Sequence, residues 1–182
     1  MFARTPRLLL RPGFPEDAPA LAAAIADEAI VKNLAAAPWP FRMRDAEAFL
    51  ATPRDPILPS FLVFERTCAA PQLVGACGLG RRPSGAVEMG YWVGRGFWGR
   101  GFATEACTAL VDLARTLGLA SLEGAYFVDN PASARVLEKL GFEALGIVAP
   151  RRSCARGADV PARLMRLRLA DETAQAGAAL AA

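Results

Sequence analysis

The chain has 182 residues, 53% of them hydrophobic, and a formal net charge of +3. A chain of this length suits one domain with one sizeable core, and its apolar composition excludes a disordered body. The charge is too small to indicate nucleic-acid binding by itself, and no apolar run in the sequence reaches the roughly 18 residues that span a bilayer.

Histidine is absent from the sequence. Its absence excludes a Ser–His–Asp triad, a Cys–His pair and a His-ligated metal within the chain. The cysteines show no metal-ligand spacing, and the N-terminal residues lack the apolar core of a signal peptide. We therefore expect a soluble cytoplasmic protein without a metal. Its general base must be a carboxylate, a water relay, a tyrosine, a lysine or a chain terminus.

The first half of the chain predicts two helices between a first strand and a group of three strands. Hydrophobic periodicity and the positions of prolines place these elements. They are a strand at 8–12, helices over 15–27 and 45–50, and strands at 61–65, 73–79 and 87–93. The Pro83-Ser84-Gly85 turn favours an antiparallel hairpin of the last two strands.

The second half predicts alternating helices and strands. They are a helix over 103–117, a strand at 122–127, a helix from Asn130 to Gly141, and strands at 142–147 and 162–169. Asn130-Pro131 is a capping residue followed by proline at the first helical position, and Gly118 fits a helix C-terminus. Without a linker or a repeat, this order predicts a mixed α/β sheet in one domain.

A glycine-rich loop joins the strand that ends at Val93 to the helix that begins at Ala103. Four glycines fall within residues 94–101. Glycine lets a ligand lie against bare backbone, and a helix start adds N–H donors and the positive end of a dipole. Such a loop is a cradle for phosphate. It lacks the dinucleotide-binding fingerprint and the Gly-Lys-Ser/Thr ending of a P-loop, so we predict another pyrophosphate-bearing cofactor.

Three motifs, in this order along the chain, resemble the GNAT acetyltransferase superfamily. Trp39-Pro40-Phe41 with 45–49 resembles an acceptor-side segment. Residues 98–106, Trp-Gly-Arg-Gly-Phe-Ala-Thr-Glu-Ala, resemble the acetyl-CoA loop in the form typical of the RimJ/RimL-like ribosomal-protein N-terminal acetyltransferases. Asn130-Pro131-Ala132-Ser133 with 138–142 resembles the segment after the fifth strand. Trp98 departs from the Gln or Arg of the general pattern.

The resemblance covers residues 7–169 and leaves an Ala-rich tail, 170–182, that we expect to be frayed or disordered. It implies a GNAT-like α/β domain, in which a mixed, mostly antiparallel sheet is flanked by helices. The fourth and fifth strands are expected to splay apart, with acetyl-CoA in the gap. The implied activity is direct transfer of acetyl from coenzyme A to an amine, without a covalent enzyme intermediate.

The resemblance also implies which residues contact the cofactor. These are Met89, Tyr91, Trp92, Val93, Arg95, Trp98, Gly99, Arg100, Gly101, Phe102, Ala103, Thr104, Asn130 and Ser133. Main-chain N–H groups of 100–103 are expected around the pyrophosphate, and the backbone of 89–93 is expected to pair with the pantetheine arm. The alternative for the loop is an ordinary strand–helix turn with solvated arginines.

The resemblance implies two catalytic residues. Glu88, just before the loop, is the candidate general base, and the alternative is a strand glutamate in a salt bridge. Ser133 is the candidate acid for the leaving thiolate, and the alternative is a helix cap. Glu105, in the first turn of the loop helix, is interpreted as structural support.

The acceptor amine must be neutral to attack. At pH 7 roughly a tenth of protein α-amines are neutral, against a few in ten thousand lysines. A modest base such as Glu88 therefore favours a protein N-terminus as acceptor. Three alternatives remain: a small amine as acceptor, a non-catalytic acyl-CoA-binding module, and a nucleic-acid binder using 163–168. We expect a monomer or homodimer that binds neither membrane nor nucleic acid.

Overall fold

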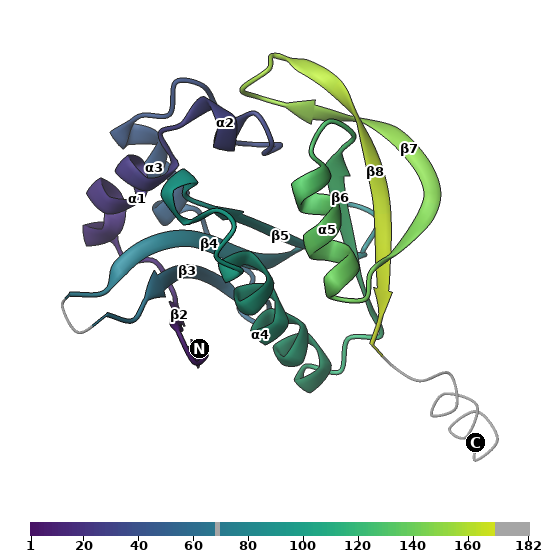
Figure 1. The fold of residues 1–182 in the computed structure, drawn as a ribbon, viewed down its shortest axis with the longest axis horizontal. Coiled ribbons are helices and arrows are strands. Elements are labelled where there is room, and N and C mark those ends of the chain that lie inside the picture. Colours follow the sequence, from purple (N-terminus) through teal and green to yellow (C-terminus); the bar gives the residue numbers. More distant parts are fainter. Residues whose placement is uncertain (68–69, 170–182) are drawn as a thin grey trace.

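The computed structural model describes residues 1–67 and 70–169, so the expected tail at 170–182 lies outside the described residues. One eight-stranded sheet has the order β1-β2-β3-β4-β5-β6-β8-β7 (Figure 1). Its strands are β1 (Ala3–Arg4), β2 (Leu8–Arg11), β3 (Ser60–Glu65), β4 (Gln72–Arg81), β5 (Val87–Val93), β6 (Ser121–Phe127), β7 (Glu143–Ser153) and β8 (Ala158–Arg168).

Helices cover both faces of this sheet. They are α1 (Ala18–Ile25), α2 (Glu28–Val31), α3 (Met43–Ala51), α4 (Phe102–Thr116) and α5 (Pro131–Lys139). The helices α4 and α5 lie on one face, where Leu110 and Leu137 join the main core, and α1 packs on the other through Leu21 (Figure 1). Among the described residues no helix is long and apolar enough to cross a membrane. The predicted α/β domain with helices flanking the sheet is confirmed.

The central strands of the sheet separate, as expected. Every neighbouring pair is antiparallel except β5 and β6, which run parallel and share one register pair, Glu88 with Glu123. The remainder of β5, from Met89 to Val93, has no partner strand on its β6 side among the described residues. The sheet therefore opens between its two halves, and the loop after Val93 lies at the end of that opening.

The expected ends of the last two strands were wrong. The strand predicted at 142–147 continues to Ser153, and the strand predicted at 162–169 already begins at Ala158. Pro150 and Pro161 lie within the observed strands and face each other in the β7–β8 register. β7 is an edge strand, and β8 has no β6 partner before Ala162, so neither proline removes a bond from a central ladder.

The turn of this longer hairpin packs against the far half of the molecule. The Cys154 N–H donates to the Ala35 carbonyl at 3.0 Å, and Arg156 Nε donates to the Lys32 carbonyl at 2.8 Å. Arg156 also pairs with Asp129. These contacts join the hairpin to the segment that follows α2, on the α1–α3 face of the sheet. They tie the two halves together beyond the opening between β5 and β6.

Candidate active site

The end of the glycine-rich loop and the start of α4, residues 99–104, present a row of unpaired N–H donors. The Gly94 N–H donates to the Val74 carbonyl, which anchors the loop to β4. Gly99 and Gly101 have φ angles of 75° and 78°, which favour glycine. Within the described chain, no acceptor is recorded for the N–H groups of 99–104. A Cβ at Gly99 would meet nothing within 4 Å, so this stretch borders open space.

An N-terminal segment fixes the orientation of one of these donors. The Arg7 guanidinium donates to the Arg100 carbonyl at 2.9 Å and lies over the Phe102 ring at 4.7 Å. Because a peptide unit is planar and trans, the Gly101 N–H points away from the carbonyl that Arg7 holds. Arg7 therefore determines the direction of a donor that it does not itself contact.

Glu105, in the first turn of α4, anchors the same segment. Its carboxylate accepts hydrogen bonds from the Thr5 hydroxyl at 2.5 Å, the Arg7 backbone N–H at 2.9 Å and the Arg7 Nε at 2.6 Å. Burial alone would raise the pKa of Glu105, but these hydrogen bonds together lower it below its ordinary value. The contacts agree with the interpretation of Glu105 as structural support.

The side chains of the loop arginines already have carboxylate partners. Arg100 pairs with Glu65 of β3 and lies over the Phe102 ring at 4.6 Å, while Arg95 pairs with Asp27 at 3.3 Å. Half-exposed Trp98 donates its ring N–H to the Val93 carbonyl at 2.7 Å. Because these guanidinium groups are already paired, the groups of the loop that remain to bind an anion are its main-chain N–H groups.

The strand β5 offers an unpaired edge next to this loop. Because the Gly94 N–H faces β4 and antiparallel strands alternate, the main-chain groups of Tyr91 and Val93 face the opposite way. Trp98 occupies the Val93 carbonyl, and no partner strand reaches the N–H groups of Tyr91 and Val93 among the described residues. A strand-like ligand can pair with such an edge.

The side chains of β5 alternate between the two faces of the sheet. Met89 is buried in the core beneath α4, and Trp92 packs on the opposite face among residues of α1 and α2. A Cβ at Gly90 would meet nothing within 4 Å, so the α1–α3 face is uncovered between Glu88 and Trp92. The side chains of Met89 and Trp92 are therefore taken up by packing, and the main-chain groups of Trp92, like those of Gly94, face β4 rather than the opening.

Ser133 and Asn130 lie at the start of α5 and are joined to β5 by Tyr91. The Ser133 N–H donates to Asn130 Oδ1 at 3.3 Å, which is the expected helix cap. The Tyr91 hydroxyl lies 2.8 Å from Ser133 Oγ and 3.2 Å from the Ser133 carbonyl oxygen. The sequence predicts a cofactor contact for the backbone of Tyr91. It does not predict that the Tyr91 hydroxyl reaches Ser133.

Glu88 lies at the closed end of the opening, where β5 and β6 still pair. One carboxylate oxygen accepts from Arg151 of β7, and the other pairs with Arg82 at 2.9 Å. The side chain is 17% exposed. The structure thus places the candidate base in ion pairs with two arginines, and its role as a base stays a prediction.

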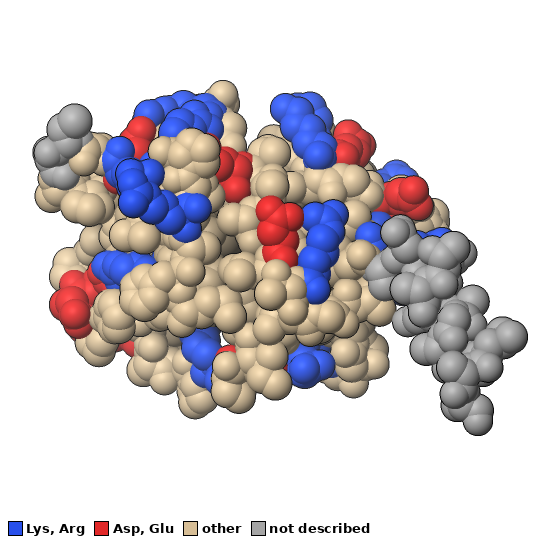
Figure 2. Space-filling view, turned by 90° about the horizontal axis from the view of Figure 1, so that it is seen from below, with Lys and Arg blue, Asp and Glu red and all other residues tan. Residues whose placement is uncertain are grey.

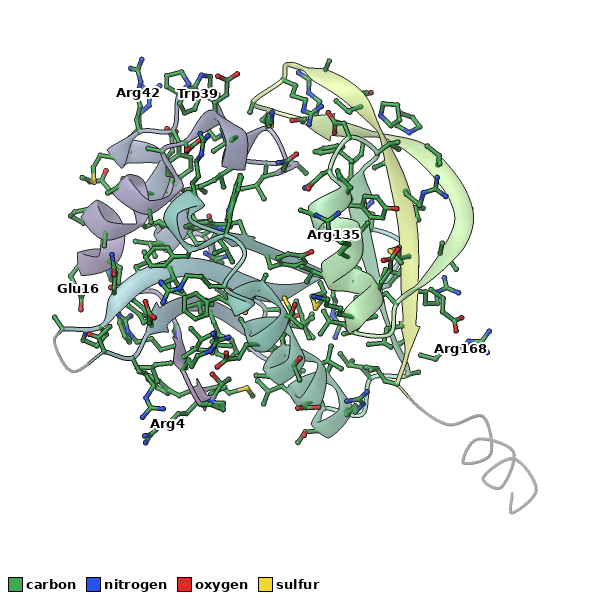
Figure 3. The ribbon with its side chains drawn as sticks, in the orientation of Figure 1. Arg4, Glu16, Trp39, Arg42, Arg135 and Arg168 are labelled. Carbon is green, nitrogen blue, oxygen red and sulfur yellow. The ribbon has the colours of Figure 1, made fainter. Side chains whose placement is uncertain are left out.

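Arg135 is a basic residue that the motif analysis missed. It is exposed on α5, two residues after Ser133, and no ion pair is recorded for it among the described residues. In Figure 3 its side chain extends from α5 toward the half of the molecule that carries α4. On the face shown in Figure 2, blue and red side chains are interspersed rather than forming one uniformly basic surface.

The described residues contain no group of three or more Cys, Asp or Glu side chains arranged to hold a metal ion.

The candidate site consists of four parts around the opening: the N–H donors of 99–104, the β5 edge, the Asn130–Ser133 helix start and Glu88. The fold brings these parts, which the motifs singled out along the chain, to one opening. A nucleotide diphosphate suits the first part and an extended amide-bearing arm suits the second.

Comparison with known proteins identifies a family and a shared fold. A family described as the acetyltransferase (GNAT) domain matches residues 7–143. The uncharacterized N-acetyltransferase p20 of Bacillus licheniformis is 35% identical over 80 residues, which are 42% of this chain and 45% of p20. That similarity thus spans less than half of either protein.

Solved structures share the fold over nearly the whole chain. An acetyltransferase of the GNAT family from Bacillus anthracis matches with a TM-score of 0.78 and 20% identity, covering 93% of this chain and 99% of that one. RimL, a ribosomal L7/L12 alpha-N-protein acetyltransferase in complex with coenzyme A, matches with a TM-score of 0.77 and 19% identity, covering 94% of this chain and 100% of its own. At these identities the likeness shows the fold.

A substitution of Glu105 tests its anchoring role. Because the folded state lowers the pKa of Glu105, its contribution is present above the unfolded value of about 4.3 and is lost as the pH falls through the folded value. Glu105→Gln should lower the free energy of unfolding by roughly 1–3 kcal/mol at pH 7, and by less near pH 3. Urea unfolding at both pH values measures the difference.

Asp112→Asn, further along α4, is the matched control. Asp112 is largely exposed and pairs with Arg115 one turn away, so its removal should change stability little. A Glu105→Gln effect no larger than that of Asp112→Asn at pH 7 would contradict the anchoring role.

Proposed function

Because the chain belongs to the GNAT acetyltransferase family, we propose that it moves an acetyl group from acetyl-CoA directly to a primary amine, and that the favoured acceptor is a protein N-terminus. The observation that carries this proposal is the continuity of two binding surfaces. The N–H donors of 99–104 follow the unpaired edge of β5 after one short turn, 94–98. We take residues 7–169 as the acetyltransferase domain.

The diphosphate of acetyl-CoA would lie against the N–H groups of 100–103 and near the positive end of the α4 dipole. Its pantetheine arm carries amides and would pair with the main chain of 89–93, as an added strand does. Exposed Arg135 on α5 would offer a further positive charge to a phosphate. Asn130, already the cap of α5, would offer its amide N–H₂ to the cofactor.

Transfer needs few chemical groups from the protein once the amine and the thioester lie together. The amine nitrogen attacks the thioester carbonyl, whose developing negative charge main-chain N–H groups stabilise. Glu88 would accept the amine proton through a water. Ser133 would donate a hydrogen bond to the departing sulfur, which needs little help because a thiol has a pKa of ~8.5.

Two observations favour an α-amine as acceptor. First, an α-amine with a pKa of ~7.7–8.0 requires only a modest base, and a carboxylate such as Glu88 lies at the opening. Second, the fold resembles RimL, whose acceptor is the α-amine of a ribosomal protein. The RimJ/RimL-like assignment, the cytoplasmic location and the choice between monomer and homodimer stay predictions.

The acceptor assignment is tested by coenzyme A release with a panel of amines. Peptides with free N-termini should give a kcat/KM at least about tenfold higher than N-terminally blocked lysine peptides or small polyamines, because far more of the α-amine is neutral. Faster turnover of a small amine would contradict the preferred acceptor. Binding of acetyl-CoA without turnover of any amine would instead indicate a binding module.

The cradle is tested by a pair of glycine substitutions. Gly99 and Gly118 have φ angles of 75° and 72°, and a Cβ at either would meet nothing within 4 Å. Gly99→Ala and Gly118→Ala should therefore carry similar backbone strain, but only Gly99 borders the proposed diphosphate site. Calorimetric titration should show about tenfold weaker acetyl-CoA binding for Gly99→Ala, equivalent to about 1.4 kcal/mol, and wild-type affinity for Gly118→Ala. Equal effects would contradict the cradle.

The role of Glu88 is tested by Glu88→Gln, which keeps the shape and removes the charge. If Glu88 is the base, kcat should fall roughly 100- to 10,000-fold while the KM for acetyl-CoA is unchanged. Glu123→Gln is the matched control, because Glu123 is the register partner of Glu88 and also pairs with an arginine. A Glu88→Gln enzyme that loses stability but keeps its kcat would show that Glu88 is an ion-pair partner and not the base.

A further inference from the structure

The Tyr91 hydroxyl, from β5, reaches Ser133 at the start of α5 across the opening between β5 and β6. The two residues are 42 positions apart in the chain, and no strand pairing joins β5 to β6 at this level among the described residues. Tyr91 packs against the core beneath α4, and its hydroxyl lies 2.8 Å from Ser133 Oγ. This contact links the strand that would hold the pantetheine arm to the serine proposed to meet the sulfur.

The environment of Tyr91 determines whether its hydroxyl is protonated. Burial raises the pKa of Tyr91, and the hydrogen bond with Ser133 only partly opposes this effect. The phenol therefore keeps its proton at neutral pH and has one hydrogen to donate. Both the Ser133 hydroxyl and the Ser133 carbonyl, at 3.2 Å, are acceptors within its reach.

Donation to the hydroxyl has a consequence for chemistry. When the Tyr91 O–H donates to Ser133 Oγ, the hydrogen of Ser133 cannot point back at Tyr91 and is available to another acceptor. The Ser133 N–H is already held by Asn130, so the residue is fixed on its backbone side as well. Ser133 is only partly buried, so α5 does not enclose it completely.

We propose that Tyr91 is a positioning residue that directs the Ser133 hydroxyl hydrogen toward the sulfur of coenzyme A as the thioester breaks. The inference rests on the proposed function. The amine nitrogen forms the new bond to the acetyl carbon, the carbon–sulfur bond breaks, and its electron pair goes to sulfur. Ser133 donates a hydrogen bond to that thiolate and keeps its proton. The amine proton leaves through Glu88 and water, and the thiolate takes a proton from solvent after release.

A double-mutant cycle separates this role from simple packing. Ser133→Ala should lower kcat about 10-fold, and Tyr91→Phe should lower it about 3- to 10-fold, because each removes one link of the same chain of hydrogen bonds. The double variant should be no slower than Ser133→Ala alone. Acetyl-CoA affinity and melting temperature should change little in Tyr91→Phe.

Tyr126→Phe is the matched control. Tyr126 is the only other tyrosine in the sequence, lies on β6 and packs against the same core. Its hydroxyl has no recorded partner in the part of the chain that the structure describes, so this variant should keep the wild-type kcat.

Three outcomes would overturn the proposal. Multiplicative losses in the double variant would show that Tyr91 acts independently of Ser133. A Tyr91→Phe enzyme that only melts earlier or binds acetyl-CoA less tightly would show a packing role. An unchanged kcat in Ser133→Ala would remove the step that Tyr91 serves. Failure of the proposed function is distinguishable from all three, because the wild type would then release no coenzyme A with any amine.

Discussion

The separation of β5 from β6 after a single register pair is the constraint on which the rest of the structure depends. A sheet that continued its pairing would consume the N–H groups of Tyr91 and Val93 and would leave no opening. Because pairing stops at Glu88, the edge of β5 is exposed just where the chain turns into the N–H donors of 99–104. Both binding surfaces therefore follow from one interruption of the ladder.

Contacts from elsewhere in the chain support this interrupted sheet. The Tyr91–Ser133 hydrogen bond joins the two sides of the opening on the α4–α5 face, and the β7–β8 turn packs against the segment after α2 on the other face. Arg7 and Glu105 hold the start of α4 against the N-terminal strands. An opening braced on both faces can accept a ligand without reorganising, which reduces the entropic cost of binding.

Much of this arrangement could be predicted from the sequence because local chemistry determines it. The glycines of 94–101, the Asn130-Pro131 helix start and the alternating strands before them each specify backbone geometry within a few residues. The extent of β7 and β8 could not be predicted, since proline is tolerated wherever a strand lacks a partner, and that depends on the whole sheet. The hydrogen-bond and ion-pair partners of Glu88, Arg100 and Tyr91 could not be predicted either, because they lie in segments that are distant in the sequence.

The most direct test is hydrogen–deuterium exchange of the protein with and without acetyl-CoA. If main-chain amides of 99–104 hold the diphosphate, their exchange should slow markedly in the complex, together with that of Tyr91 and Val93. Amides at the far end of α4, near Gly118, should exchange as before. Demonstrated binding of acetyl-CoA that leaves 99–104 exchanging at the rate of the free protein would contradict the central claim.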